Sequence, residues 1–187
     1  MAQNAAFTRM DNSSREEWML VGQATIDAQA RVPLQVLAML RSFEGFHAGF
    51  GVDQLHHCLQ TASLAKRANA TDEVVLAALC HDIGKVVSIP NHGPIAAEML
   101  KPYVGHDVYQ VVRTHQDFQM RHYGSHFGMS PTLREQYRSE AWFALAEQFT
   151  EEWDQVAFDP SYPVLPLGEF EPLVMQYFGR FPRSSNP

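Results

Sequence analysis

Cysteine and positive charge are both scarce in this chain of 187 residues. Its two cysteines, Cys58 and Cys80, fall in apolar stretches with helical periodicity, so we expect buried reduced thiols and no disulfide framework. Lysine and arginine number 14 against 21 aspartates and glutamates, which gives a formal net charge of −7. An acidic chain offers no broad electrostatic surface for nucleic acid or for an anionic membrane, so neither partner is expected.

Long apolar runs and strand-like alternation are also missing. No run is long enough to span a membrane, and the first residues, MAQNAAFTRMDNSSRE, lack the apolar segment of a signal peptide. A cytoplasmic protein is the resulting expectation. The length suits one domain with a full core. We therefore predict an all-α, single-domain protein at residues 15–181, with flexible tails at 1–14 and 182–187.

Helical spacing of apolar residues divides the chain into segments that we expect to be helices. In the first of them, Trp18, Val21 and Ile26 are the expected inward positions. A long helix is expected after Ser130 and Pro131, which suit a helix start. One helix is expected to begin at Pro33 and to include Val36, Leu37 and Leu40. The other expected helices cover residues 16–28, 53–68, 73–83, 95–103, 108–115, 131–157 and 170–181.

One stretch, EVVLAALCHDIGKV at Glu73–Val86, organises the rest. A helix that is apolar on every side is a buried central helix, and Gly84 is placed to end it. His81 and Asp82 follow at its buried end, where an imidazole and a carboxylate are costly unless paired or bound to metal. Adjacent helix positions point about 100° apart, so Asp82 can lie between two ions while His81 binds one of them. The alternative is a polar helix cap.

The chain has nine histidines, and their order matters more than their number. A single histidine on an apolar helix is more often a structural residue than a ligand. Four imidazoles and two carboxylates together are too many for one catalytic ion, but they suit two ions with a bridging carboxylate. Such donors suit iron, manganese or zinc. The predicted ligands are His57, His81, Asp82, His92, His115 and Asp154.

The HDIGK sequence and the order His, His-Asp, His, His, Asp resemble the HD-domain superfamily. Mononuclear HD phosphohydrolases need only a His, the His-Asp pair and a late Asp. The two further histidines are similar to those of the mixed-valent diiron oxygenases, namely myo-inositol oxygenase and the hydroxyphosphonate oxygenases. The best matching segments are QLHHCLQTA, VVLAALCHDIGKV and WDQVAFDP. This resemblance implies an HD helical bundle, two iron ions as an Fe(II)/Fe(III) pair, and O2 as co-substrate.

The sequence departs from both kinds of oxygenase where they hold substrate. The phosphonate enzymes carry Tyr-x-x-Glu before the first ligand histidine, and here that stretch reads His47-Ala-Gly-Phe50. Inositol oxygenase has a second substrate lysine four residues after its last aspartate, and here that residue is Phe158. Lys85 does match the lysine that holds substrate in inositol oxygenase. The substrate therefore stays open between a phosphonate, a polyol and another hydroxylated compound.

Two segments supply further candidates for substrate contact. The loop FEGFHAGFG, residues 43–51, joins glycines to aromatic residues, and we expect a lid from which His47 reaches an ion. The segment HQDFQMRHYGSHFGM, residues 115–129, is expected to be a connection that lines the site. The predicted catalytic or substrate residues are Lys85, His47, Gln119 and His122.

The favoured function is a diiron oxygenase that uses O2 to oxidise or cleave a small polar hydroxylated substrate. The alternative is a metal-dependent HD phosphohydrolase or phosphodiesterase, in which manganese or zinc would replace iron. A third alternative is an inactive sensor that binds a nucleotide or metal. Phosphohydrolases usually carry several arginines or lysines near the metals, and the candidate segments contain only Lys85 and Arg121, which favours the oxygenase.

Overall fold

The computed structural model describes residues 4–180, and within that range it is helical and contains no strand. This confirms the all-α prediction. Shorter 3-10 or π segments separate and extend the helices. The α-helices are α1 (Arg15–Gln29), α2 (Val32–Arg41), α3 (Gln54–Arg67), α4 (Asp72–Cys80), α5 (His92–Leu100), α6 (His106–Tyr123), α7 (Phe143–Gln148) and α8 (Glu171–Phe178). The short segments are η1 (Met10–Asn12), η2 (Ile83–Val86), η3 (Gly124–Phe127), η4 (Leu133–Tyr137), η5 (Phe149–Asp154) and η6 (Leu167–Glu169).

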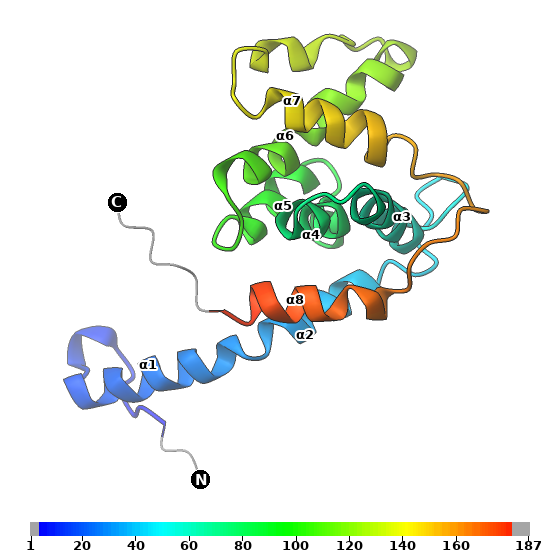
Figure 1. The fold of residues 1–187 in the computed structure, drawn as a ribbon. Helices are drawn as coiled ribbons and strands as arrows, with labels where there is room; N and C mark the ends of the chain where they lie inside the picture. Colours follow the sequence, from blue (N-terminus) through cyan, green and yellow to red (C-terminus); the bar gives the residue numbers. More distant parts are fainter. Residues whose placement is uncertain (1–3, 181–187) are drawn as a thin grey trace.

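Helix α4 lies in the middle of the bundle (Figure 1). Helix α3 packs against it. Helix α6, which packs with α5 and α7, covers one side, and α2 packs with α8 on the other. Every residue from Val74 to Cys80 is buried, as expected for a helix that is apolar on every side. Cys58 and Cys80 are free and buried, which also agrees with the sequence.

Helix α6 is longer than predicted. Residues 116–123 continue it to Tyr123 instead of forming a connection. Phe118 explains the continuation, because it extends the buried face of Val111, Val112 and His115 by one more turn and is itself fully buried. The histidines and glutamines of this segment therefore project from a helix of fixed geometry.

The long helix predicted for residues 131–157 is wrong. The chain forms the short segment η4, turns, and then runs through α7 into the π-helical segment η5. Tyr137 and Trp142 both contact Phe118, with ring centroids 6.1 and 6.3 Å away. Residues five apart on one straight helix point about 140° from each other, so the chain has to bend to bring both rings to Phe118.

Helix α1 extends away from the bundle (Figure 1) and buries none of its residues. The prediction that Trp18, Val21 and Ile26 point into the core is therefore wrong. Trp18 packs beside Phe7 and donates to Ser13 at 2.6 Å. A capping box at Ser14 and Glu17 begins the helix. Among residues 4–180, no helix has the length and apolar character needed to cross a membrane. Residues 182–187 lie outside the described residues, and the predicted domain bounds stay a prediction.

Candidate metal centre

Five elements bring the six predicted ligand residues to one place in the bundle. Each of these residues is at most 5% exposed. Helix α3 supplies one histidine, the end of α4 supplies the His-Asp pair, and α5, α6 and η5 supply one residue each. The six are His57, His81, Asp82, His92, His115 and Asp154.

The first group of donors consists of His57, His81 and Asp154. The Nε2 atoms of His57 and His81 lie 3.1 Å apart. Oδ1 of Asp154 lies 3.3 Å from the first of these nitrogens and 3.5 Å from the second. The ligand atoms of all three residues lie within 4.8 Å of one another, a spacing that could hold a metal ion.

The second group joins His92 and His115 to Asp82. Their Nε2 atoms are 3.1 Å apart, and Oδ1 of Asp82 lies 3.0 Å from that of His92 and 3.6 Å from that of His115. Ligand atoms of His81, Asp82 and His115 also lie within 4.8 Å of one another, so the two groups adjoin.

Asp82 lies between the groups and turns one oxygen to each. Its Oδ2 is 3.6 Å from Nε2 of His57 and 3.6 Å from Nε2 of His81. Its Oδ1 faces His92 and His115 instead. The sequence predicted that Asp82 would lie between two ions. The structure places its carboxylate between the two groups of donors, and the ions stay a prediction.

The hydrogen bonds of the four imidazoles fix which nitrogen faces inward. Each Nδ1 lies 2.7–3.0 Å from a backbone carbonyl oxygen, namely those of Ala157, Ala78, Ile89 and Val112. A carbonyl only accepts, so each Nδ1 carries hydrogen and each neutral ring presents a lone pair at Nε2. Two facing lone pairs cannot form a hydrogen bond, and a shared cation removes their repulsion.

Two buried carboxylate oxygens support the same conclusion. Oδ1 of Asp82 and Oδ1 of Asp154 have no hydrogen-bond donor. The neighbouring Nε2 atoms have no proton to give while the rings are neutral. A buried anionic oxygen without a donor is unfavourable, and such atoms call for an explanation such as an ion. The donor set therefore fits metal ions.

Without metal, the buried carboxylates and imidazole nitrogens of the centre favour the uptake of a proton. Burial lowers the pKa of His81, but the carboxylates of Asp82 and Asp154 outweigh burial and raise that pKa to about 9. Burial would raise the pKa of both carboxyls, yet His81 and the other imidazoles hold each pKa well below its usual range. Burial lowers the pKa of His115. Without metal, the centre thus favours a proton on His81, at the Nε2 that a cation would occupy.

Glycine and a π-helical turn give the ligands their positions. The prediction that Gly84 ends α4 is wrong. Helix α4 ends at Cys80, and Gly84 lies inside η2. Its Cα lies against the backbone of His92, where a Cβ would come within 2.2 Å of the carbonyl oxygen. Asp154 is the last residue of the π-helical η5, a distortion that is frequent at functional sites. Nε2 of Gln119 donates to Oδ2 of Asp154 at 2.7 Å and leaves Oδ1 toward the histidines.

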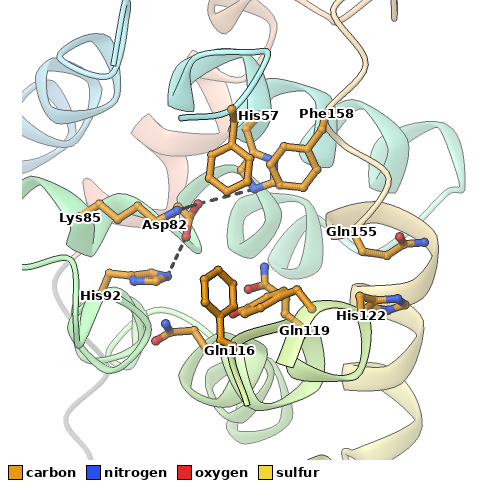
Figure 2. A pocket seen from close by; sticks show the side chains of 12 residues that line it. His57, Asp82, Lys85, His92, Gln116, Gln119, His122, Gln155 and Phe158 are labelled. Carbon is orange, nitrogen blue, oxygen red and sulfur yellow. Dashed lines mark hydrogen bonds and ion pairs between the residues drawn. The ribbon is translucent and has the colours of Figure 1, made fainter. Parts of the chain in front are cut away.

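A cavity of about 430 Å³ opens beside the centre. In Figure 2, Lys85, Asp82 and His92 lie at one end and His122 and Gln155 at the other. The lining residues are Phe50, His57, Asp82, Lys85, His92, Gln116, Gln119, His122, Tyr123, Phe127, Gln155 and Phe158.

Of the predicted substrate residues, Lys85, Gln119 and His122 line this cavity and His47 does not. Nζ of Lys85 donates to Oδ2 of Asp82 at 2.6 Å and to Oε1 of Gln54 at 2.7 Å. Nε2 of His122 lies 3.3 Å from a Glu151 carboxylate oxygen. His47 is on the exposed part of its loop.

Several lining residues escaped the sequence-based prediction. Phe50 belongs to the predicted lid. It lines the cavity, whereas His47, the residue of that loop expected at the site, does not. Gln155 and Phe158 also line the cavity. The available signal was their position one and four residues after the predicted ligand Asp154. Gln54 lies outside the lining and was also missed, because it contacts Lys85 across 31 residues and no local pattern signals that contact.

Comparison with known proteins assigns the chain to a family. The model of the HD domain family matches residues 55–157, which is more than half of the chain, and the chain belongs to that family. A stretch of 76 residues is 36% identical to hydroxymethylphosphonate dioxygenase of Gimesia maris. The match covers 34% of this chain and 38% of that protein, so it spans well under half of the relative's length.

Proposed function

We propose that this chain is a dinuclear iron oxygenase that uses O2 to oxidise or cleave a small hydroxylated substrate. The observation that carries the proposal is the position of Asp82, whose two carboxylate oxygens face two separate pairs of imidazole nitrogens. A single catalytic ion would leave His92 and His115 as buried acceptors with no purpose. Imidazole and carboxylate donors suit iron, and the similar dioxygenase of Gimesia maris supports oxygen chemistry.

In this proposal, His57, His81 and Asp154 would hold one ion, His92 and His115 would hold a second, and Asp82 would serve both. When bound, the iron pair supplies the redox chemistry with O2 that no protein side chain provides. The four Nδ1–H groups that donate to backbone carbonyls keep each imidazole in its ligand orientation and tautomer.

The side chains around the cavity would bind and orient the substrate. Lys85 has its ammonium at the cluster end of the cavity, where it can donate to a substrate oxygen while Gln54 and Asp82 hold it in place. Gln119 keeps Asp154 oriented and gives a further polar group to the wall. Phe158 covers the ring of His57, with centroids 4.5 Å apart, and shields that ligand from water.

The charge of the cavity favours an oxygenase over a phosphohydrolase. Lys85 is the one lysine or arginine among the lining residues. Arg121 has an exposed side chain that points to Glu151, 4.0 Å away. Enzymes that cleave phosphate esters usually place several such cations on the phosphate oxygens, because they stabilise the charge of the transition state.

The two chemistries can be separated by removing the second group of donors. Iron-loaded protein should consume O2 in the presence of the right hydroxylated compound, and His92→Ala should abolish this uptake. His106→Ala, at the exposed start of α6, is the control and should leave uptake unchanged. Cleavage of phosphate esters without O2, equally fast with manganese and retained in His92→Ala, would show a mononuclear hydrolase and reject the proposal.

A further inference from the structure

A stack of three rings forms one wall of the cavity. The ring of the ligand His57 lies on Phe158, with centroids 4.5 Å apart and planes 19° apart. Phe158 lies in turn on Phe50, at 4.9 Å and 25°. Phe50 is still 48% exposed although it lines the cavity. The stack therefore leads from the metal centre toward solvent and ends in an aromatic residue that has apolar surface left to cover.

The rest of the cavity away from the cluster has little charge. Figure 2 places Gln116 and Gln119 across the cavity from Phe158. The two rings of Tyr123 and Phe127 also line it, and they meet edge to face at 6.2 Å. Its far end has the carboxamide of Gln155.

The basic side chains of the lining already have acidic partners inside the protein. Lys85 is bonded to Asp82 at the cluster end. His122, at the far end, faces Glu151. An anionic head group placed between the aromatic walls would meet carboxamides and rings and no free cation of the lining, which makes its desolvation unfavourable.

We propose that Phe50 and Phe158 form a subsite for a flat apolar group, and that the substrate joins such a group to the hydroxyl-bearing carbon. Rings stacked with an offset attract one another beyond the effect of buried area, and Phe50 loses exposed apolar surface when a flat group covers it. The orientation of the substrate, with its hydroxyl beside Lys85 and Asp82, rests on the proposed function. The preference for a flat group depends only on the two phenylalanine rings and not on the metal ions.

The preference can be tested by binding with two alcohols of equal carbon number. Naphthylmethanol is flat, decahydronaphthylmethanol is at least as apolar but puckered, and hydroxymethylphosphonate is small and anionic. Affinities are measured by calorimetric titration of the full chain, loaded with metal and free of O2. Naphthylmethanol should bind about tenfold more tightly than its saturated counterpart, because only the flat compound can stack. It should also bind more tightly than the phosphonate.

Variants decide whether the stack causes the preference. Phe50→Leu and Phe158→Leu keep apolar volume but lose the flat surface, so each should reduce the preference for the flat alcohol by about fivefold. Phe46→Leu, in the same loop but outside the lining, is the matched control and should keep it. Circular dichroism and metal content establish that each variant is folded and loaded.

Specific results would overturn the subsite. These are equal binding of the two alcohols, an unchanged preference in both phenylalanine variants, tighter binding of the phosphonate, or no binding of either alcohol. The titration is repeated on metal-free protein, where the flat alcohol should keep its advantage. A retained preference in a protein that binds one metal or consumes no O2 would leave the subsite standing and reject the proposed function. If the protein binds two metal ions and consumes O2 but shows no preference for the flat alcohol, the subsite is rejected and the proposed function stands.

Discussion

Gly84 and His92 are in backbone contact. A Cβ on Gly84 would lie 2.2 Å from the His92 carbonyl oxygen and 2.8 Å from its Cα, distances that real side chains do not reach. The glycine after the His-Asp pair therefore serves the second group of donors, because it lets α5 begin against η2 with its first residue beside Asp82. A change at this one position should affect the two halves of the centre differently.

Gly84→Ala should displace His92 and leave the first group of donors in place. Metal content after full reconstitution should fall from two ions per chain toward one. The overpacking should lower the free energy of unfolding by about 1–3 kcal/mol. Gly22→Ala is the control, because a Cβ there meets nothing within 4 Å, and it should keep two ions. Two tightly bound ions in Gly84→Ala would contradict the role assigned to this contact.

Lys85→Ala should keep both metal ions and weaken the binding of substrate. An ammonium is not a metal ligand while charged, whereas a charge-assisted hydrogen bond typically contributes about 1.5–3 kcal/mol, so kcat/KM should fall by about tenfold or more. Gln54→Leu removes the amide that holds the ammonium at 2.7 Å and should give a smaller loss of the same kind. Metal analysis and steady-state kinetics on one preparation measure both effects.

Lys66→Ala provides the control for that pair. Lys66 is on the same helix as Gln54, its side chain is 45% exposed, and its nearest carboxylate is 3.9 Å away. Its removal should change neither metal content nor kinetics. Loss of metal in Lys85→Ala, or full activity in that variant, would show that the lysine has another role.

The pKa of His81 predicts how pH acts on the centre. In the metal-free protein this pKa is about 9, above the ordinary 6.5, because of Asp82 and Asp154. A raised pKa in the folded state stabilises the fold below the unfolded value, and this contribution is lost as pH rises from about 6.5 through 9. The Tm of metal-free protein should therefore fall over that window.

Metal binding should show the opposite trend, because an ion has to displace the proton of His81. Apparent affinity should rise by up to about tenfold per pH unit between pH 7 and 9 and then level off. Calorimetric titration in two buffers that differ in ionisation enthalpy measures the protons released. Metal binding without proton release at pH 7 would contradict the assigned state of His81.

The helical class and the ligand set were predictable, because both depend on short-range patterns. Seven buried residues in succession at Val74–Cys80 require a central helix, and a His-Asp pair at its buried end needs partners. His57, His115 and Asp154 were predicted to stand on helix faces, whereas His92 was expected outside the helices and is in fact the first residue of α5. The structure brings all of them together, and their role as metal ligands stays a prediction.

What could not be predicted depends on contacts between distant segments. The bend before α7 follows from rings that meet on Phe118, and the extension of α6 follows from burial of that same residue. Phe158 was visible as a departure from the lysine of inositol oxygenase, and Phe50 as part of the predicted lid. Their stacking joins positions 108 residues apart in sequence, so no local pattern signalled it.

The central claim is that Asp82 is shared by two iron ions, and electron paramagnetic resonance of iron-loaded, partly reduced protein tests it most directly. The account predicts the signal of a spin-coupled Fe(II)/Fe(III) pair, which should change when the substrate alcohol is added and disappear in His92→Ala. One iron per chain with only the signal of isolated Fe(III), unchanged in His92→Ala, would contradict it.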